Sequence, residues 1–283
     1  MGKEKAIETI LEKAFKRIQT PTLLPLKTIE PFVHPDHHGQ IAKMISPSGE
    51  VLALRYDSTL SLVVSEGVKK QNSVYYMEPK FSFDFNKNRV EETMQIGIER
   101  FMTQADLLDD RRYFEMVALA EELASSICEG PFITEVSHTD GLDSLIGVMA
   151  LSSAETLKLK HYIFRKNKQQ SQKLMIKNRI AVDAQQQLLA LMDCRGSYDE
   201  VLSKLVELSP PIGILNWVQT LEELHKQSKG KLVIEPTASD RLGYYRGNTF
   251  KIYDILNHRE IISGGCYAFD AFDVKGVGFS IYL

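Results

Sequence analysis

The sequence predicts an α+β fold in which an antiparallel sheet flanked by helices is interrupted by a helical insertion. Strand-like patterns dominate before Gly141, polar amphipathic helices replace them as far as Lys226, and strand patterns return after Gly230. These observations predict one core built from two separate parts of the chain. The first part of the core, the insertion and the second part of the core are predicted at residues 1–140, 141–228 and 229–283.

Four short elements open the first part of the core. Apolar residues at helical spacing, interrupted by charges, predict an amphipathic helix and exclude a secretory signal. Prolines bound the extended segment that follows, and a Pro-Ser-Gly turn centres a hairpin. In chain order, the helix, the extended segment, the hairpin and a further short helix are predicted at residues 3–17, 18–26, 42–55 and 59–67.

The stretch from Tyr75 to Arg100 predicts a long hairpin. Its first strand is rich in aromatic and β-branched residues, and asparagines mark the turn. The second strand alternates an apolar with a polar face, namely Met94, Ile96 and Ile98 against Gln95, Gly97 and Glu99. An amide, a glycine and a carboxylate on one side form a floor suited to a small polar ligand. Spacing alone leaves a solvated strand face as the alternative.

Further elements complete the first part of the core and the insertion. Apolar residues recur every three or four positions from Asp109 to Ala124, which predicts a helix. A strand is predicted from Ile133 to His138. Within the insertion, the clearest amphipathic helices run from Ser197 to Leu205 and from Ile214 to His225.

The composition is that of an ordinary soluble globular protein. The chain has 283 residues, a formal charge of −3 and 43% hydrophobic residues, so it lacks a global field that would attract nucleic acid. No apolar run is long enough to cross a bilayer. Three cysteines lie far apart, at Cys128, Cys194 and Cys266, which predicts a reduced, cytoplasmic setting and no zinc site.

A histidine-rich loop, HPDHHG, is the strongest metal candidate in the sequence. It places His34, His37 and His38 near Asp36. Metal sites usually draw their ligands from defined helical or hairpin spacings, whereas this loop is bounded by proline and glycine. We therefore predict that the chain holds neither a metal nor a cofactor.

Several segments, in this order, resemble motifs of the class II aminoacyl-tRNA synthetases, specifically of the histidyl-tRNA synthetase lineage. Singly each match is weak, whereas together they span the chain from about Arg17 to its last residue. The pair FSFDF and QIGIE, at residues 81–85 and 95–99, resembles the hairpin called motif 2. The other matching segments are Leu54–Thr59, Leu242–Gly247, Ser263–Tyr267 and Gly276–Ile281, the last resembling the start of motif 3.

The resemblance implies an amino-acid pocket. Two residues would face the α-amino group, two would lie near the amino group and the imidazole, and two tyrosines would line the side-chain pocket. In that order they are Asp57 and Thr59, Gln95 and Glu99, and Tyr245 and Tyr267. A carboxylate opposite an imidazole N–H would select histidine over apolar amino acids. Without the resemblance, the sequence predicts that Asp57 and Glu99 are ordinary solvated carboxylates and that the two tyrosines belong to the hydrophobic core.

The departures from the family motifs remove the cations that amino-acid activation requires. Ser82 stands where the family has the motif 2 arginine, and Asp84 replaces the glutamate beside it. Asp240 and Cys266 occupy two further arginine positions, the first with its charge reversed where the substrate carboxylate would lie. A serine donates one neutral hydrogen bond and cannot form a bidentate charged fork. Adenylation by the family mechanism is therefore not expected, and no anticodon-binding domain is predicted.

These losses are typical of one branch of the lineage, the regulatory subunits of ATP phosphoribosyltransferase. The resemblance to this branch implies a non-catalytic subunit required for the first step of histidine biosynthesis, with feedback by histidine. It implies a short-form catalytic subunit as partner and a self-dimer within a hetero-oligomer, without tRNA or membrane. Two alternatives remain: a divergent ligase that uses Lys80, Lys87 or Arg89 as its cations, and a free-standing amino-acid or tRNA sensor.

Overall fold

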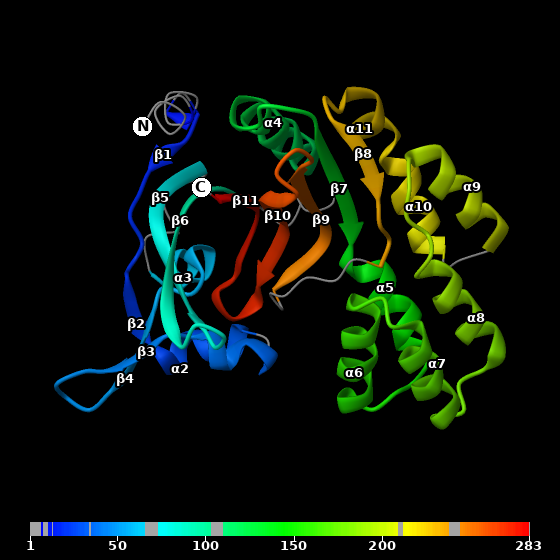
Figure 1. Ribbon diagram of the computed structural model, residues 1–283, viewed down its shortest axis with the longest axis horizontal. Coiled ribbons are helices and arrows are strands. Elements are labelled where there is room, and N and C mark those ends of the chain that lie inside the picture. Colours follow the sequence, from blue (N-terminus) through cyan, green and yellow to red (C-terminus); the bar gives the residue numbers. More distant parts are fainter. Residues whose placement is uncertain are drawn as a thin grey trace.

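The computed structural model of the protein describes Ile7, Leu11, Glu12 and residues 14–33, 35–65, 73–102, 110–208, 212–237 and 244–282. Among these, eight strands form one twisted sheet in the order β1-β5-β6-β11-β10-β9-β7-β8 (Figure 1). Their bounds are β1 Lys16–Arg17, β5 Ser73–Asp84, β6 Arg89–Phe101, β7 Phe132–His138, β8 Lys231–Ile234, β9 Tyr245–Asp254, β10 Arg259–Phe269 and β11 Val274–Tyr282.

Both parts of the chain contribute to this sheet, which confirms the predicted fold class. The strands β9, β10 and β11 from the end of the chain lie between β6 and β7 from its first half. Neighbouring strands are antiparallel from β5 to β7, while the outer pairs β1–β5 and β7–β8 are parallel. Parallel pairing requires a long crossover. The helical insertion, which connects β7 to β8, provides that crossover for the second outer pair.

The predicted hairpin of residues 75–100 is present as β5 and β6. The turn between them places Asn88 at a φ of 49°, a conformation that asparagine tolerates well. Tyr76 lies directly opposite Gly97, and a side chain at this glycine would overlap the tyrosine ring. The glycine of the predicted polar face therefore makes room for an aromatic ring from the neighbouring strand.

A smaller sheet and two short helices lie beside this hairpin. The smaller sheet has the order β2-β4-β3, with bounds Leu23–Pro25, Val51–Leu54 and Lys43–Ile45, and it contains the predicted hairpin of residues 42–55. The short helices are α2 (Leu26–Ile29) and α3 (Ser58–Val64). The helix predicted at residues 3–17 falls largely outside the described residues. Its predicted end was wrong, because Lys16 and Arg17 pair with β5 as strand β1.

Helix α4 (Arg111–Ile127) covers one face of the large sheet, where the core is found. Its buried apolar side chains belong to one core cluster with alternating residues of the neighbouring strands β6 and β11, among them Ile96, Ile98, Val277 and Phe279. Seven helices of the described insertion stand beside the β7–β8 end of the sheet (Figure 1). They are α5 Thr139–Gly147, α6 Ser153–Phe164, α7 Lys168–Lys177, α8 Val182–Leu191, α9 Tyr198–Leu208, α10 Ile212–Thr220 and α11 Glu222–Gln227.

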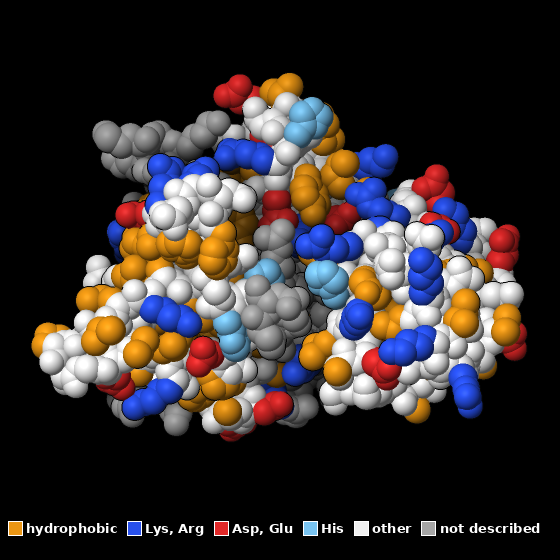
Figure 2. Space-filling model, turned by 60° about the horizontal axis from the view of Figure 1, so that its bottom comes forward, with side chains coloured by type: hydrophobic (Ala, Val, Ile, Leu, Met, Phe, Trp, Pro, Cys, Tyr) orange, Lys and Arg blue, Asp and Glu red, His pale blue; other side chains and the backbone are white. Residues whose placement is uncertain are grey.

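One predicted insertion helix is divided in the structure. The stretch from Ile214 to His225 forms the end of α10 and the start of α11, because the chain tightens at Leu221. There the backbone N–H of Leu221 donates to the carbonyl of Val218, three residues earlier, at 3.1 Å. On the face seen in Figure 2, basic and acidic side chains of the described residues are interspersed rather than gathered by sign.

Glu121 of α4 links the end of the insertion to the core through hydrogen bonds. Its carboxylate is 1% exposed and accepts hydrogen bonds from the Thr134 hydroxyl (2.6 Å), the Ser228 hydroxyl (2.6 Å) and the Lys229 N–H (2.7 Å). All the donors point at acceptor oxygens. A neutral amide in place of the carboxylate would therefore present an N–H group to at least one donor.

We predict that Glu121→Gln lowers the free energy of unfolding by about 2 kcal/mol, because one buried donor loses its acceptor. Urea denaturation measures this change. The neighbouring exposed residue offers a matched control, and Glu122→Gln is expected to leave the midpoint unchanged. Equal midpoints for both variants would contradict the role given to Glu121.

Candidate ligand-binding site

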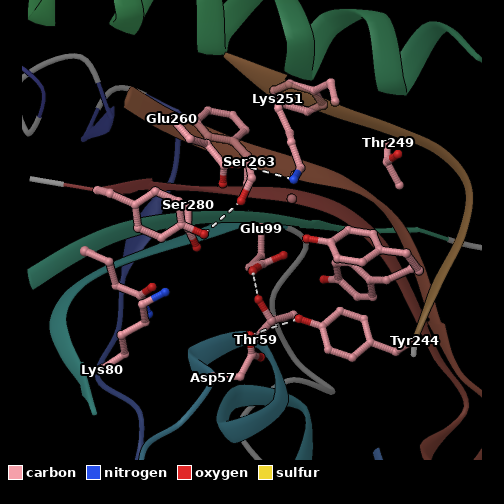
Figure 3. A pocket seen from close by; sticks show the side chains of 18 of the residues that line it. Asp57, Thr59, Lys80, Glu99, Tyr244, Thr249, Lys251, Glu260, Ser263 and Ser280 are labelled. Atoms are coloured by element: carbon pink, nitrogen blue, oxygen red, sulfur yellow. Dashed lines mark hydrogen bonds and ion pairs between the residues drawn. The ribbon is translucent and has the colours of Figure 1, made fainter. Parts of the chain in front are cut away.

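A cavity of about 500 Å³ lies on the face of the large sheet opposite α4 (Figure 3). Its floor is formed by β5, β6, β9, β10 and β11, and the start of α3 closes one side. All the residues predicted to bind an amino acid line it, namely Asp57, Thr59, Gln95, Glu99, Tyr245 and Tyr267. The tertiary structure thus brings together side chains that are up to 210 positions apart in the sequence.

Asp57 begins helix α3. One carboxylate oxygen accepts the backbone N–H of Leu60 at 2.7 Å, as an N-cap does, and the other accepts the hydroxyl of Tyr244 at 3.0 Å. Burial raises the pKa of Asp57, and these two hydrogen bonds oppose the rise. Because both oxygens already have donors, Asp57 mainly fixes the helix and the tyrosine at the cavity wall.

Glu99 is the most deeply buried carboxylate of the cavity, with 1% of its surface exposed. Its Oε1 accepts the Thr59 hydroxyl at 2.5 Å and the Tyr76 hydroxyl at 3.3 Å. Burial raises its pKa to about 8; the hydrogen bond from Thr59 opposes the rise, and the negative charge of Asp57 adds to it. Burial therefore favours the protonated form of Glu99, whereas an N–H group that donates to this carboxyl would favour the ionised form.

Two buried polar atoms at this end of the cavity lack a well-formed hydrogen-bond partner among the described residues. The Oε2 atom of Glu99 and the hydroxyl of Tyr267 are buried, and neither makes a hydrogen bond of normal geometry with a described residue. The hydroxyl is still near enough to influence the pKa of Glu99. Buried polar atoms are rarely left unpaired. A ligand that donates an N–H or O–H group here would satisfy them.

Glycines create the space that Glu99 and Tyr267 occupy. A side chain at Gly278 would overlap the Glu99 carboxylate, and one at Gly276 would lie 2.5 Å from the Tyr267 hydroxyl. The glycines of the last matching segment are thus explained by close side-chain packing across β11. Gln95, which is 3% exposed, donates its amide N–H to the hydroxyl of Ser58.

Tyrosines form one wall of the cavity. The rings of Tyr244 and Tyr245 stack with their centroids 5.1 Å apart, and Tyr244 meets the edge of Tyr267 at 6.2 Å. Sequence analysis selected Tyr245 but missed Tyr244, whose hydroxyl positions Asp57. The pair of adjacent tyrosines in the matching segment was the signal from which Tyr244 could also have been predicted.

The positions predicted to mark a lost nucleotide site lie in different places. Ser82 lines the cavity. Asp84 does not, because it accepts backbone N–H groups of Asn86 and Lys87 in the hairpin turn. Cys266 faces the core under α4, where burial raises the pKa of its thiol to about 12. Asp240 lies outside the described residues.

Several residues of the cavity wall were not among the predicted site residues. Among the described residues of the cavity wall, the cationic side chains are Lys80, which the sequence suggested only as a cation of a divergent ligase, and Lys251, which it did not suggest. Other unanticipated residues are Glu135, Glu260, Ser263, Ser280 and Tyr282. They lie on strands whose neighbours in the sheet are distant in sequence, so no local pattern could have grouped them.

The structure describes only part of the histidine-rich loop. Across the described residues, no group of three or more His, Cys, Asp or Glu side chains is arranged to hold a metal ion. His34 lies outside them, and the ring of His38 is hydrogen-bonded to the carbonyl of Val33 at 2.8 Å. Of the helices that the structure describes, none has the length and apolar character needed to cross a membrane.

The fold and the cavity define a class II synthetase-like core with a polar cavity, and comparison with known proteins identifies its family. Residues 3–283 match the family model described as histidyl-tRNA synthetase, so the chain belongs to that family. The match extends through the insertion and both parts of the sheet.

Curated relatives carry a more specific name. A protein of Thermotoga maritima named ATP phosphoribosyltransferase regulatory subunit is 25% identical over 238 residues, covering 83% of this chain and 82% of the relative. A protein of Streptococcus gordonii with the same name is 23% identical, covering 96% and 83%.

Solved structures share the fold. A chain of the ATP phosphoribosyltransferase complex of Thermotoga maritima superimposes with a TM-score of 0.74 at 20% identity, covering 100% of this chain and 96% of that one. A Bacillus halodurans protein described as an ATP phosphoribosyltransferase regulatory subunit or histidyl-tRNA synthetase gives 0.78 at 18% identity, covering 99% and 77%.

Proposed function

We propose that this chain is a non-catalytic regulatory subunit of ATP phosphoribosyltransferase and acts in the first step of histidine biosynthesis. The observation that carries the proposal is the contrast between the two halves of the cavity. Glu99, Thr59 and Tyr267 form a buried polar end suited to an amino acid, while the described wall of the other end has no arginine. The names of the curated relatives support the same function.

The chemistry of the cavity argues against adenylation. Activating an amino acid with ATP requires cations that hold the α-phosphate and the charge developing in the transition state. Ser82 supplies a neutral hydroxyl, and the cations of the described cavity wall, Lys80 and Lys251, are lysines. A lysine is a flexible point charge and does not replace the bidentate fork of an arginine.

The proposed partner is a short-form catalytic subunit, and the proposed assembly is a hetero-oligomer that contains a self-dimer of this chain. Regulation would then be a coupling free energy between the cavity and the active site of the partner. We further propose histidine as the effector, with its imidazole or ammonium N–H groups facing Glu99 Oε2 and the Tyr267 hydroxyl. Binding of tRNA forms no part of the proposed function.

Reconstitution with the catalytic subunit tests this function. The two chains are expected to co-purify, and the partner is expected to gain phosphoribosyltransferase activity and histidine inhibition only when this chain is added. The matched controls are each chain alone. A partner that is fully active and histidine-sensitive by itself would contradict the proposal.

The rival function, a divergent ligase that uses other cations, is favoured only by the presence of Lys80 in the cavity wall. An exchange assay with ATP, labelled pyrophosphate and each amino acid separates the two functions. We expect no exchange above background. Robust exchange with any amino acid would favour the ligase.

A further inference from the structure

A second row of polar side chains crosses the cavity floor beside the row that contains Glu99. In the register of the sheet, Glu99 of β6 lies opposite Gly278 of β11. Two positions further along β11, Ser280 lies opposite Ser263 of β10, which in turn lies opposite Lys251 of β9. Residues two apart share a face and are about 7 Å apart along a strand. The second row therefore runs parallel to the first at about that distance.

Hydroxyl and ammonium groups from further along the strands lie beside this second row (Figure 3). The hydroxyls of Ser263 and Tyr282 are 2.8 Å apart and hydrogen-bonded. The ammonium of Lys80 lies 4.4 Å from the centroid of the Tyr282 ring. Lys251 of β9 lies opposite Ser263 in the sheet register. Lysines from β5 and β9 thus flank a pair of hydrogen-bonded hydroxyls from β10 and β11.

Carboxylates near this row have cationic partners of their own. Glu260 pairs with Lys251 at 3.2 Å, and Glu135 pairs with Arg195 at 2.8 Å. Lys80 adds a further positive charge, and its field also reaches Asp57, where it favours the ionised form. The two rows therefore differ in character: protonatable carboxyl and phenol groups around Glu99, and ammonium and hydroxyl donors in the second row.

We propose that Lys80, Lys251, Ser263, Ser280 and Tyr282 form a subsite for an oxyanion, either the carboxylate or the phosphate group of a small ligand. The other end of that ligand donates a hydrogen bond to Glu99. Hydroxyls supply directed donors, and lysines bind such anions as point charges. The subsite therefore binds an anion without the bidentate fork that adenylation needs. The inference deepens the proposed ligand site but is independent of the catalytic partner.

Titration calorimetry of the full chain with inorganic phosphate and, separately, with L-histidine tests the subsite. The variant Lys80→Met is expected to weaken binding of the oxyanion roughly 10- to 100-fold, the effect of losing one charge-assisted contact. The matched control is Lys158→Met. Lys158 also lies over a tyrosine ring, at 5.9 Å from the centroid of Tyr162, but outside the cavity.

A second variant keeps the test independent of Lys80. Lys251→Gln is expected to weaken binding by a similar factor, whereas Lys226→Gln, which breaks the exposed pair with Glu222, is expected to leave it unchanged. Thermal unfolding of each variant verifies that it is folded. Ser263→Ala, which removes one hydroxyl without changing charge, is expected to have a smaller effect in the same direction.

The two anions distinguish the source of the charge. Weakening of phosphate binding alone assigns the subsite to phosphate esters, and weakening of histidine binding alone assigns it to carboxylates. If the variants weaken the binding of both phosphate and histidine, and the two ligands compete, the subsite accepts both phosphate and carboxylate groups. Unchanged affinities in the Lys80 and Lys251 variants, or no binding of either anion at millimolar concentration, would overturn the inference. A chain that fails to activate the catalytic subunit yet binds phosphate through Lys80 would refute the proposed function and leave the subsite standing.

Discussion

Replacing Glu99 by glutamine is expected to stabilise the protein by several kcal/mol at alkaline pH. Burial raises the pKa of this carboxyl from an ordinary 4.5 to about 8, so ionising it costs more in the folded chain than in the unfolded chain. Between these two pH values the folded state binds more protons, and stability falls as pH rises. The total loss is on the order of 5 kcal/mol. Above pH 8 both states are ionised, and this contribution stays constant.

Glutamine avoids this loss because it carries no charge. Its oxygen can still accept the hydroxyl of Thr59, and its amide N–H can donate toward the hydroxyl of Tyr267, which has no hydrogen bond of normal geometry with a described residue in the parent protein. The variant should therefore match the parent near pH 4 and become progressively more stable than the parent between about pH 4.5 and 8. Asp57, whose pKa burial also raises, leaves part of the pH dependence in place.

Denaturation at pH 5, 7 and 9 is the measurement. Glu91→Gln is a control of opposite sign, because hydrogen bonds from Lys87 and Arg89 lower the pKa of this partly exposed carboxyl. A Glu99→Gln variant with the same pH profile as the parent would show that Glu99 titrates normally. The same variant should bind an N–H donor ligand less tightly than the parent, since one acceptor oxygen becomes a donor.

Replacing Arg55 by methionine is expected to cost about 3–5 kcal/mol of stability. This arginine belongs to a segment that matches the family, but it does not line the cavity. Its side chain is 4% exposed and donates to the carbonyls of Thr20 and Pro79, each at 2.7 Å. Its Nε lies 3.4 Å from the carboxylate of Glu78, which is also buried. Removing the guanidinium leaves this carboxylate without its cation.

Glu78 also accepts hydrogen bonds from Thr20, so the buried pair of Arg55 and Glu78 connects several segments of the chain. The carboxylate accepts the backbone N–H of Thr20 at 3.1 Å and the hydroxyl of the same residue. Arg55 and Glu78 therefore join the segment after β1 to strand β5 and to the small sheet. The arginine has a structural role, although it lies in a segment that contains two predicted ligand residues, Asp57 and Thr59.

Chemical denaturation of Arg55→Met and of the double variant Arg55→Met/Glu78→Gln measures this role. The double variant should recover part of the loss because no buried charge remains unpaired. Arg89→Met is the matched control: Arg89 is 66% exposed and pairs with Glu91 on the surface, where such pairs contribute little. If Arg55→Met unfolds at the same denaturant concentration as the control, the buried pair does not stabilise the fold.

Alternation and spacing in the sequence correctly predicted the elements with strong local signals. The hairpin of β5 and β6, helix α4 and strand β7 agree with the structure to within a few residues. The end of the first predicted helix was wrong, because pairing of Lys16 and Arg17 with a distant strand overrode the local apolar pattern. The parallel outer pairs of the sheet were also missed, since strand direction depends on crossovers that no local pattern encodes.

For the site, the sequence by itself determined which residue types are present and which arginines are replaced. Glu99, Gln95 and Tyr245 stand out on local motifs, and so does Ser82. Only the tertiary structure decided what these residues do. Register across the sheet places Ser280, Ser263 and Lys251 in one row, and burial raises the pKa of Glu99. Burial and register depend on contacts between distant segments, which is why the second half of the cavity could not be predicted from the sequence.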